Sequence, residues 1–200
     1  NTPNLLNLLV RTIVGSCRIA ITMPQFSSED EDCGIFMQER YPDLRSCSGK
    51  EENSMKKVLT IAGSDCSGGA GVQADLKTMA AHGVFGMSVI VSVVAENTAR
   101  VIDIQDISTR MIEEQIDAVF EDIVPDAVKI GMLYDKEIIH KTAECLRAHH
   151  AKNIVLDPVM MSSSGQVLLR RDAAETLIRE LFPLCTLVTP NLHEAAAICG

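Results

Sequence analysis

Glycine residues that are suited to holding a small ligand gather at Gly63–Gly71, between an apolar run and a helical pattern. Glycine lets the backbone approach a ligand closely, and the start of a helix attracts anions. The segment lacks a Gly-Lys-Ser/Thr sequence and the G-x-G-x-x-G spacing, so it is neither a P-loop nor a dinucleotide fingerprint. We interpret it as a ligand-contacting loop, with a tight structural turn as the alternative.

Three carboxylates and one asparagine follow apolar runs further along the chain. Glu96 could pair with an amino group or a ring nitrogen of a heterocycle, or it could be an exposed turn residue. Asp157 could orient Mg²⁺, although aspartate before proline is also common in turns. Asn191 and Glu194 begin a helical pattern, where they fit both a capping box and a hydrated Mg²⁺ site.

Alternating strand and helix patterns must position these residues. Runs rich in Val, Ile and Leu predict strands, and apolar residues spaced three and four apart predict helices. We predict strands at 57–62, 89–94, 127–132, 153–156 and 186–189, and helices at 70–82, 108–124, 136–150, 172–181 and 190–199. Thr109 is the predicted cap of the second helix. This order predicts an α/β fold with a mainly parallel sheet covered on both faces, whose ligands bind at the carboxyl ends of the strands.

The composition limits the class of protein. The chain has 200 residues and is 46% hydrophobic, so it can bury a core. It carries a net charge of −9 and offers no basic stripe for binding nucleic acid. No uncharged apolar run is long enough to span a membrane, so we expect no membrane partner. Its 7 cysteines include no C-x-x-C pair, which disfavours a zinc site. Their scatter along a chain that can bury a core favours buried or incidental thiols in a reducing cytoplasm.

The chain divides into two unlike pieces. Residues 1–54 contain an acidic run at 27–32 and end in a linker-like stretch at 46–54. A targeting segment is one interpretation of this piece, and an unassigned, poorly ordered leader or linker is the one we prefer, because transit peptides are richer in Arg and Ser. The strand and helix pattern begins at Met55, so we expect the folded domain to be 55–200.

The second piece resembles a known enzyme family. Lys57–Thr78 resembles the opening of the hydroxymethylpyrimidine/phosphomethylpyrimidine kinases, which belong to the ribokinase-like superfamily. Further matching blocks follow in order at 94–98, 129–133, 155–160 and 189–195. The resemblance covers 55–200 and none of 1–54. It implies a ribokinase-like three-layer α/β/α fold, here truncated at its C-terminal side.

The resemblance also implies a function and a set of site residues. It implies ATP- and Mg²⁺-dependent phosphorylation of 4-amino-5-hydroxymethyl-2-methylpyrimidine and then of its monophosphate, for thiamine biosynthesis, by a protein that is a homodimer when complete. The implied substrate-binding residues are Gly63, Ala70, Asp75, Val94, Glu96, Met132 and Val159. The implied phosphate and metal residues are Asp157, Asn191 and Glu194.

The sequence departs from the family pattern at one point, and two other functions are possible interpretations of it. The resemblance places a Gly-Thr-Gly anion hole and the catalytic base after Gly200, so we expect no kinase activity from this chain alone. The alternatives are a pyridoxal kinase of the same superfamily and a catalytically inactive binding module. Glu96 favours the pyrimidine, because a carboxylate suits an aminopyrimidine edge better than an oxygen-bearing pyridine.

Overall fold

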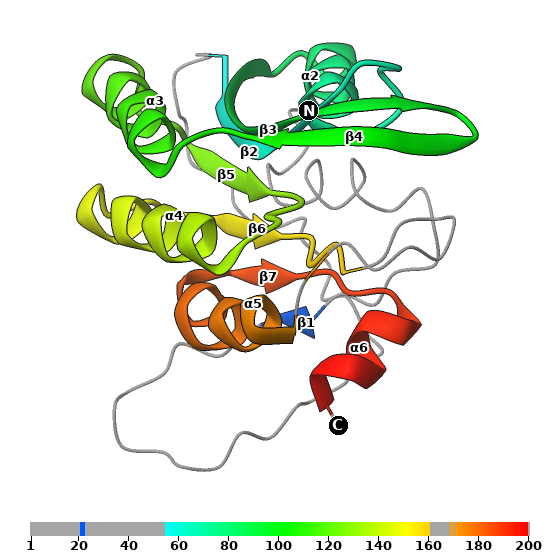
Figure 1. The fold of residues 1–200 in the computed structure, drawn as a ribbon. Coiled ribbons are helices and arrows are strands. Elements are labelled where there is room, and N and C mark those ends of the chain that lie inside the picture. Colours follow the sequence, from blue (N-terminus) through cyan, green and yellow to red (C-terminus); the bar gives the residue numbers. More distant parts are fainter. Residues whose placement is uncertain (1–20, 23–54, 161–168, 170, 200) are drawn as a thin grey trace, which may run out of the picture.

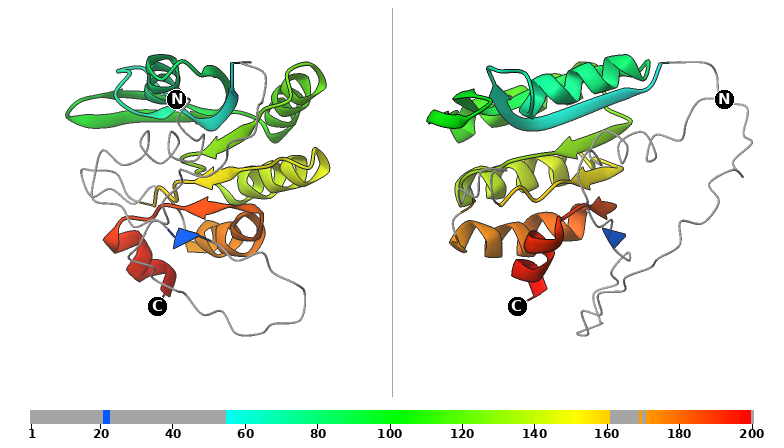
Figure 2. Two further views of the ribbon diagram at one scale, coloured as in Figure 1. Left: turned by 180° about the vertical axis from the view of Figure 1, so that it is seen from behind. Right: turned by 90° about the vertical axis from the view of Figure 1, so that its right-hand side faces the viewer.

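The computed structural model describes residues 21–22, 55–160, 169 and 171–199. Within them a seven-stranded sheet forms the centre of the molecule, in the order β1-β7-β6-β5-β2-β3-β4 (Figures 1 and 2). The strands are β1 (Ile21–Thr22), β2 (Lys57–Asp65), β3 (Phe85–Asn97), β4 (Arg100–Asp106), β5 (Ala127–Ile130), β6 (Ile154–Leu156) and β7 (Leu187–Val188). The five strands β2, β3, β5, β6 and β7 are parallel, which confirms the predicted mainly parallel sheet.

Both edges of the sheet carry antiparallel strands that the sequence analysis did not predict. At one edge, β4 pairs with β3, and at the other β1, which lies within residues 1–54, pairs with β7. The β3–β4 turn is closed by the Asn97 side chain, which accepts hydrogen bonds from the backbone N–H groups of Ala99 (3.0 Å) and Arg100 (3.1 Å). This turn keeps the end of β3 paired, so β3 extends past the predicted 89–94.

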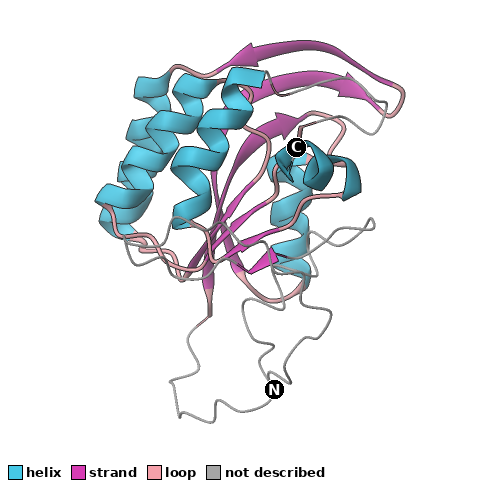
Figure 3. Cartoon of the chain, turned by 90° about the horizontal axis from the view of Figure 1, so that it is seen from below, coloured by secondary structure: helices cyan, strands magenta, loops and turns pink. Residues whose placement is uncertain are grey.

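Helices cover both faces of the sheet, as Figure 3 shows. They are α2 (Gly71–Ala81), α3 (Thr109–Asp122), α4 (Lys136–Ala148), α5 (Arg171–Thr176) and α6 (Leu192–Cys199). The predicted helix 172–181 is in fact α5 followed by a π-helical turn (Leu177–Leu181), and a 3₁₀ turn (Phe182–Leu184) comes next. No helix in the described part of the chain is long and apolar enough to cross a bilayer.

The two faces of the sheet bury different sets of apolar side chains, because successive residues of a strand point to opposite faces. Leu59 and Ile61 belong to the larger core cluster, which they share with side chains of α3, α4 and α5. Val58 belongs to the smaller cluster, which includes Met79 of α2. The predicted layers are therefore confirmed.

The cap of α3 differs from the prediction by one residue. The Ser108 hydroxyl, not Thr109, accepts the hydrogen bond from the Met111 backbone N–H (3.3 Å). Ser108 has the extended backbone that a capping residue needs, whereas Thr109 is already helical.

Candidate ligand-binding site

The end of β2 forms one wall of the candidate site. Gly63 is buried, and a side chain there would begin 2.9 Å from the Ser92 Oγ, 3.3 Å from the Met132 Cε and 3.7 Å from the Val94 Cγ2. The structure thus brings together three predicted residues, Gly63, Val94 and Met132, from β2, β3 and the segment after β5. These strands are neighbours, and all of their carboxyl ends lie at one edge of the sheet.

The glycine-rich loop wraps around a carboxylate that the sequence analysis did not single out. Asp65 is 3% exposed and accepts hydrogen bonds from the backbone N–H groups of Ser67 (2.6 Å), Gly69 (3.0 Å) and Ala70 (2.7 Å). Burial acts to raise the pKa of Asp65, but these bonds and one from the Ser67 hydroxyl hold it below its ordinary value. Three loop N–H groups that could attract an anion are therefore occupied by the aspartate of the loop itself.

Glu96 lies at the end of β3, next to this loop. The Cys66 thiol donates to the Glu96 carbonyl oxygen (3.1 Å) and accepts from the Glu96 N–H (3.4 Å). The Glu96 side chain is half-buried, and its pKa is raised, first by burial and then by the charge of the nearby Asp65. The structure therefore places the backbone of Glu96 against the glycine-rich loop, and the pairing of its carboxylate with a ligand stays a prediction.

The two thiol contacts of Cys66 predict a small but measurable effect on ligand affinity. We expect Cys66→Ala to weaken binding of the pyrimidine that the resemblance implies by about 2- to 5-fold, because a thiol is a weak donor and acceptor and its two bonds together contribute no more than about 1 kcal/mol. Cys66→Ser keeps a donor and an acceptor and is expected to remain within about 2-fold of wild type. Isothermal titration calorimetry measures both variants, and equal affinities for Cys66→Ala and wild type would contradict the prediction.

Asp75 points from α2 toward the sheet and is 7% exposed. One of its oxygens, Oδ2, accepts hydrogen bonds from the Thr60 hydroxyl (2.6 Å) and from the Lys129 ammonium (2.8 Å). Sequence reasoning missed Lys129, although a lone lysine inside a short apolar strand is a signal that a buried partner exists.

The residues predicted for phosphate and metal binding gather at β6 and β7. Asn191 and Glu194 form the predicted capping box: the Glu194 N–H donates to the Asn191 Oδ1 (2.9 Å), and the Asn191 N–H donates to the Glu194 Oε2 (2.8 Å). Glu194 also accepts from the Met160 N–H (3.3 Å), which ties α6 to the segment after β6. That segment includes Asp157, which is 7% exposed, and the half-buried Val159.

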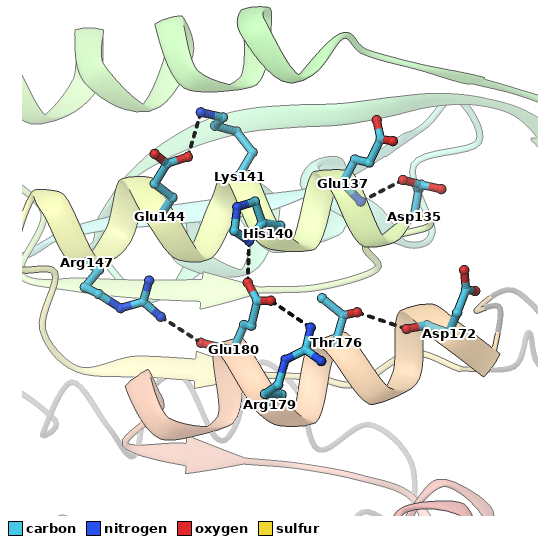
Figure 4. Close-up of polar contacts among 10 residues, drawn as sticks. All are labelled: Asp135, Glu137, His140, Lys141, Glu144, Arg147, Asp172, Thr176, Arg179 and Glu180. Carbon is cyan, nitrogen blue, oxygen red and sulfur yellow. Dashed lines mark hydrogen bonds and ion pairs between the residues drawn. The ribbon is translucent and has the colours of Figure 1, made fainter. Parts of the chain in front are cut away.

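A concave region lies on the helical layer and contains none of these residues. It is a groove of about 370 Å³ lined by Thr109, Lys136, Glu137, His140, Lys141, Thr176, Arg179 and Glu180. As Figure 4 shows, the His140 Nδ1 contacts the Glu180 Oε2 (2.6 Å), and Arg179 pairs with the same carboxylate (3.0 Å). The His140 hydrogen bond is the main cause that lowers the pKa of Glu180. The contact of His140 with Glu180 joins α4 to the turn after α5, so we interpret the groove as a helix–helix contact.

The fold is that of an α/β protein, and it places the candidate site at the carboxyl edge of a parallel sheet, where such proteins bind their ligands. The profile of the phosphomethylpyrimidine kinase family matches residues 65–200. The hydroxymethylpyrimidine/phosphomethylpyrimidine kinase of Rhizobium meliloti is 52% identical over 143 residues, which cover 72% of this chain and 53% of that protein. This chain therefore belongs to the phosphomethylpyrimidine kinase family.

Solved structures confirm the ribokinase-like fold. The phosphomethylpyrimidine kinase of Clostridium difficile has a TM-score of 0.69 at 52% identity, with 72% of this chain and 62% of that chain covered. The pyridoxal kinase of Staphylococcus aureus, solved with AMP-PCP, has a TM-score of 0.64 at 40% identity, with 72% and 52% covered. The chain spans about half the length of the curated relatives that it matches.

Proposed function

We propose that this chain provides the pyrimidine-binding part of an ATP-dependent kinase of thiamine diphosphate biosynthesis. Its substrates are 4-amino-5-hydroxymethyl-2-methylpyrimidine and then the monophosphate of that compound. The observation that carries the proposal is the position of Glu96, a half-buried residue whose backbone is held beside the glycine-rich loop by two contacts with the Cys66 thiol. The family membership supports the same activity.

The site residues have distinct parts in binding the pyrimidine. Val94 and Met132 supply apolar walls for the ring. Glycine at 63 lets these walls pack closely on the end of β2, because a side chain there would begin 3.3 Å from the Met132 Cε. The Glu96 carboxylate accepts a hydrogen bond from the amino group of the ring and so fixes its orientation. Ala70, Asp75 and Val159 complete the proposed substrate-binding set.

The residues that follow β6 and β7 suit a hydrated Mg²⁺ that accompanies ATP. The described residues contain no group of three or more His, Cys, Asp or Glu side chains placed to hold a metal ion. Both Glu194 oxygens already accept backbone hydrogen bonds, from Asn191 and Met160. Mg²⁺ keeps several waters and needs only one or two carboxylates when nucleotide phosphates also bind it, so Asp157, Asn191 and Glu194 fit. When bound, Mg²⁺ offsets the negative charge of the phosphates.

Pyridoxal kinase is the second candidate function, because the Staphylococcus aureus enzyme shares the fold at 40% identity. Both ligands are hydroxymethyl heteroaromatic rings, so the fold does not separate them. The pyrimidine is favoured because the phosphomethylpyrimidine kinase relative is more similar, at 52%, and because a carboxylate pairs with an amino group.

We also propose that the complete protein is a homodimer in the cytoplasm. The exposed edge strand β4 supports a partner at that edge, since Ile102 is 62% exposed there and Val93 of the neighbouring β3 is 47% exposed. The free thiols of Cys66, Cys145 and Cys185 support a reducing compartment.

A chimera tests the proposed function. Residues 55–200 replace the corresponding part of the Rhizobium meliloti relative, and the product is assayed with ATP, Mg²⁺ and either the pyrimidine or pyridoxal. We expect ATP-dependent phosphorylation of the pyrimidine, which is lost when the chimera carries Glu96→Ala. A chimera that folds and phosphorylates pyridoxal faster than the pyrimidine would overturn the proposal in favour of the second candidate.

A further inference from the structure

Lys129 carries a buried charge to which no function has been assigned so far. It lies on β5 in the interior of the sheet and is 6% exposed. Its ammonium lies 2.8 Å from the Asp75 Oδ2, which also accepts from the Thr60 hydroxyl at 2.6 Å. A charge in this position is costly unless it is paired, so the contact with Asp75 is strongly favoured. The pair ties β5 to α2.

The ammonium lies close to the chain segments that form the walls of the candidate site. A side chain at Gly131 would begin 2.9 Å from the Lys129 Nζ and 3.0 Å from the Ala62 Cβ. Gly131 immediately precedes Met132, and Ala62 immediately precedes Gly63. Glycine at 131 therefore leaves the space that the ammonium occupies, next to two wall residues of the pyrimidine site.

Asp75 connects this charge to the glycine-rich loop. It lies one helical turn after Gly71, the first residue of α2. Gly71 packs so tightly on the Gly63 carbonyl oxygen that a side chain would overlap it. The residue before it, Ala70, donates its N–H to Asp65 (2.7 Å). A force that holds Asp75 therefore holds the first turn of α2 and the loop that precedes it.

We propose that Lys129 is a positioning residue of the ligand site. Through Asp75, its ammonium holds the first turn of α2, and with it the loop 65–70, against the Glu96 end of β3. Lys129 itself does not need to touch the ligand. The identity of that ligand rests on the proposed function. The effect of Lys129 on the position of the loop does not depend on which ligand binds.

The thiol of Cys66 reports on the loop without any ligand, because it hydrogen-bonds with the Glu96 backbone and those bonds break when the loop moves away from β3. We measure its rate of alkylation by iodoacetamide, resolved by peptide mass spectrometry, in wild type and in Lys129→Met, which keeps the apolar stem. We expect at least about 5-fold faster alkylation in the variant, because the loop opens more often. Cys145 and Cys185 are buried and free, so their labelling reveals any global unfolding.

A control separates positioning from a general loss of stability. Ile139 is fully buried in α4 on the opposite face of the sheet, and we use Ile139→Val or Ile139→Ala, whichever matches the melting temperature of Lys129→Met. Lys129→Ala adds a rescue: n-propylammonium should restore slow Cys66 alkylation, whereas uncharged 1-propanol should not. The proposal is overturned if Cys66 reacts in Lys129→Met at the wild-type rate, or if the Ile139 variant accelerates it equally.

Pyrimidine binding gives the second measurement. We expect Lys129→Met to bind 4-amino-5-hydroxymethyl-2-methylpyrimidine about 10-fold more weakly than wild type, a change of about 1.4 kcal/mol, while the matched Ile139 variant binds normally. If wild type does not bind the pyrimidine, the proposed function fails, and the Cys66 rates still decide the role of Lys129. Wild-type affinity in Lys129→Met would overturn the positioning role.

Discussion

Replacing Glu96 by alanine is expected to weaken binding of the pyrimidine by about 10- to 100-fold, because a hydrogen bond to a charged group contributes about 1.5–3 kcal/mol. Glu96→Gln keeps a carbonyl acceptor and is expected to retain more of the affinity. The matched control is Glu121→Ala, which removes an exposed glutamate from α3. Calorimetric titration of the four proteins measures the effect, and an undiminished affinity in Glu96→Ala would rule out a direct role for this residue.

The same residue predicts a pH dependence of binding. Burial and the Asp65 charge raise the pKa of Glu96, so its carboxylate takes up a proton at a higher pH than an exposed glutamate does. The charged form accepts the hydrogen bond from the amino group. Affinity is therefore expected to fall as the pH drops through this raised pKa, and to be full above it. Glu96→Gln does not titrate, so a fall of equal size in that variant would assign the pH dependence to another group.

Gly71→Ala is expected to lower the free energy of unfolding by about 2–4 kcal/mol and to abolish ligand binding, because it combines backbone strain with a steric overlap. Gly71 has φ of +57°, and a side chain there would overlap the Gly63 carbonyl oxygen. The first turn of α2 must therefore move away from β2, and the glycine-rich loop moves with it.

Gly83 provides the matched control for this substitution. It has a similar φ of +69°, but a side chain there meets no atom within 4 Å. Gly83→Ala therefore carries the backbone strain alone and is expected to cost about 1 kcal/mol. Urea unfolding followed by circular dichroism compares the two variants. Equal losses of stability would show that the close contact of Gly71 with Gly63 is unimportant.

The layered fold could be predicted from sequence because its signal is local. Runs such as Val58–Ala62 and the spacing of apolar residues in α3 identify a strand and a helix without knowledge of their partners. The hairpin partner β4 escaped prediction because it is a largely exposed edge strand, so it lacks the continuous apolar run of the central strands.

Residues that follow predicted strands could be named from the sequence as candidates for the site. The structure brings Gly63, Val94 and Met132 together and places Glu96 beside the loop. The sequence did not reveal the pairing of Asp75 with Lys129, because those residues are 54 positions apart and only the packing of α2 on the sheet makes them neighbours. Electrostatic partners of this kind depend on tertiary structure.

A crystal structure of this chain with 4-amino-5-hydroxymethyl-2-methylpyrimidine tests the central claim most directly. We predict that the ring lies between Val94 and Met132, with its amino group within hydrogen-bond distance of the Glu96 carboxylate. A ring bound elsewhere, for example in the groove lined by His140 and Glu180, would contradict the assignment of this edge of the sheet as the pyrimidine site.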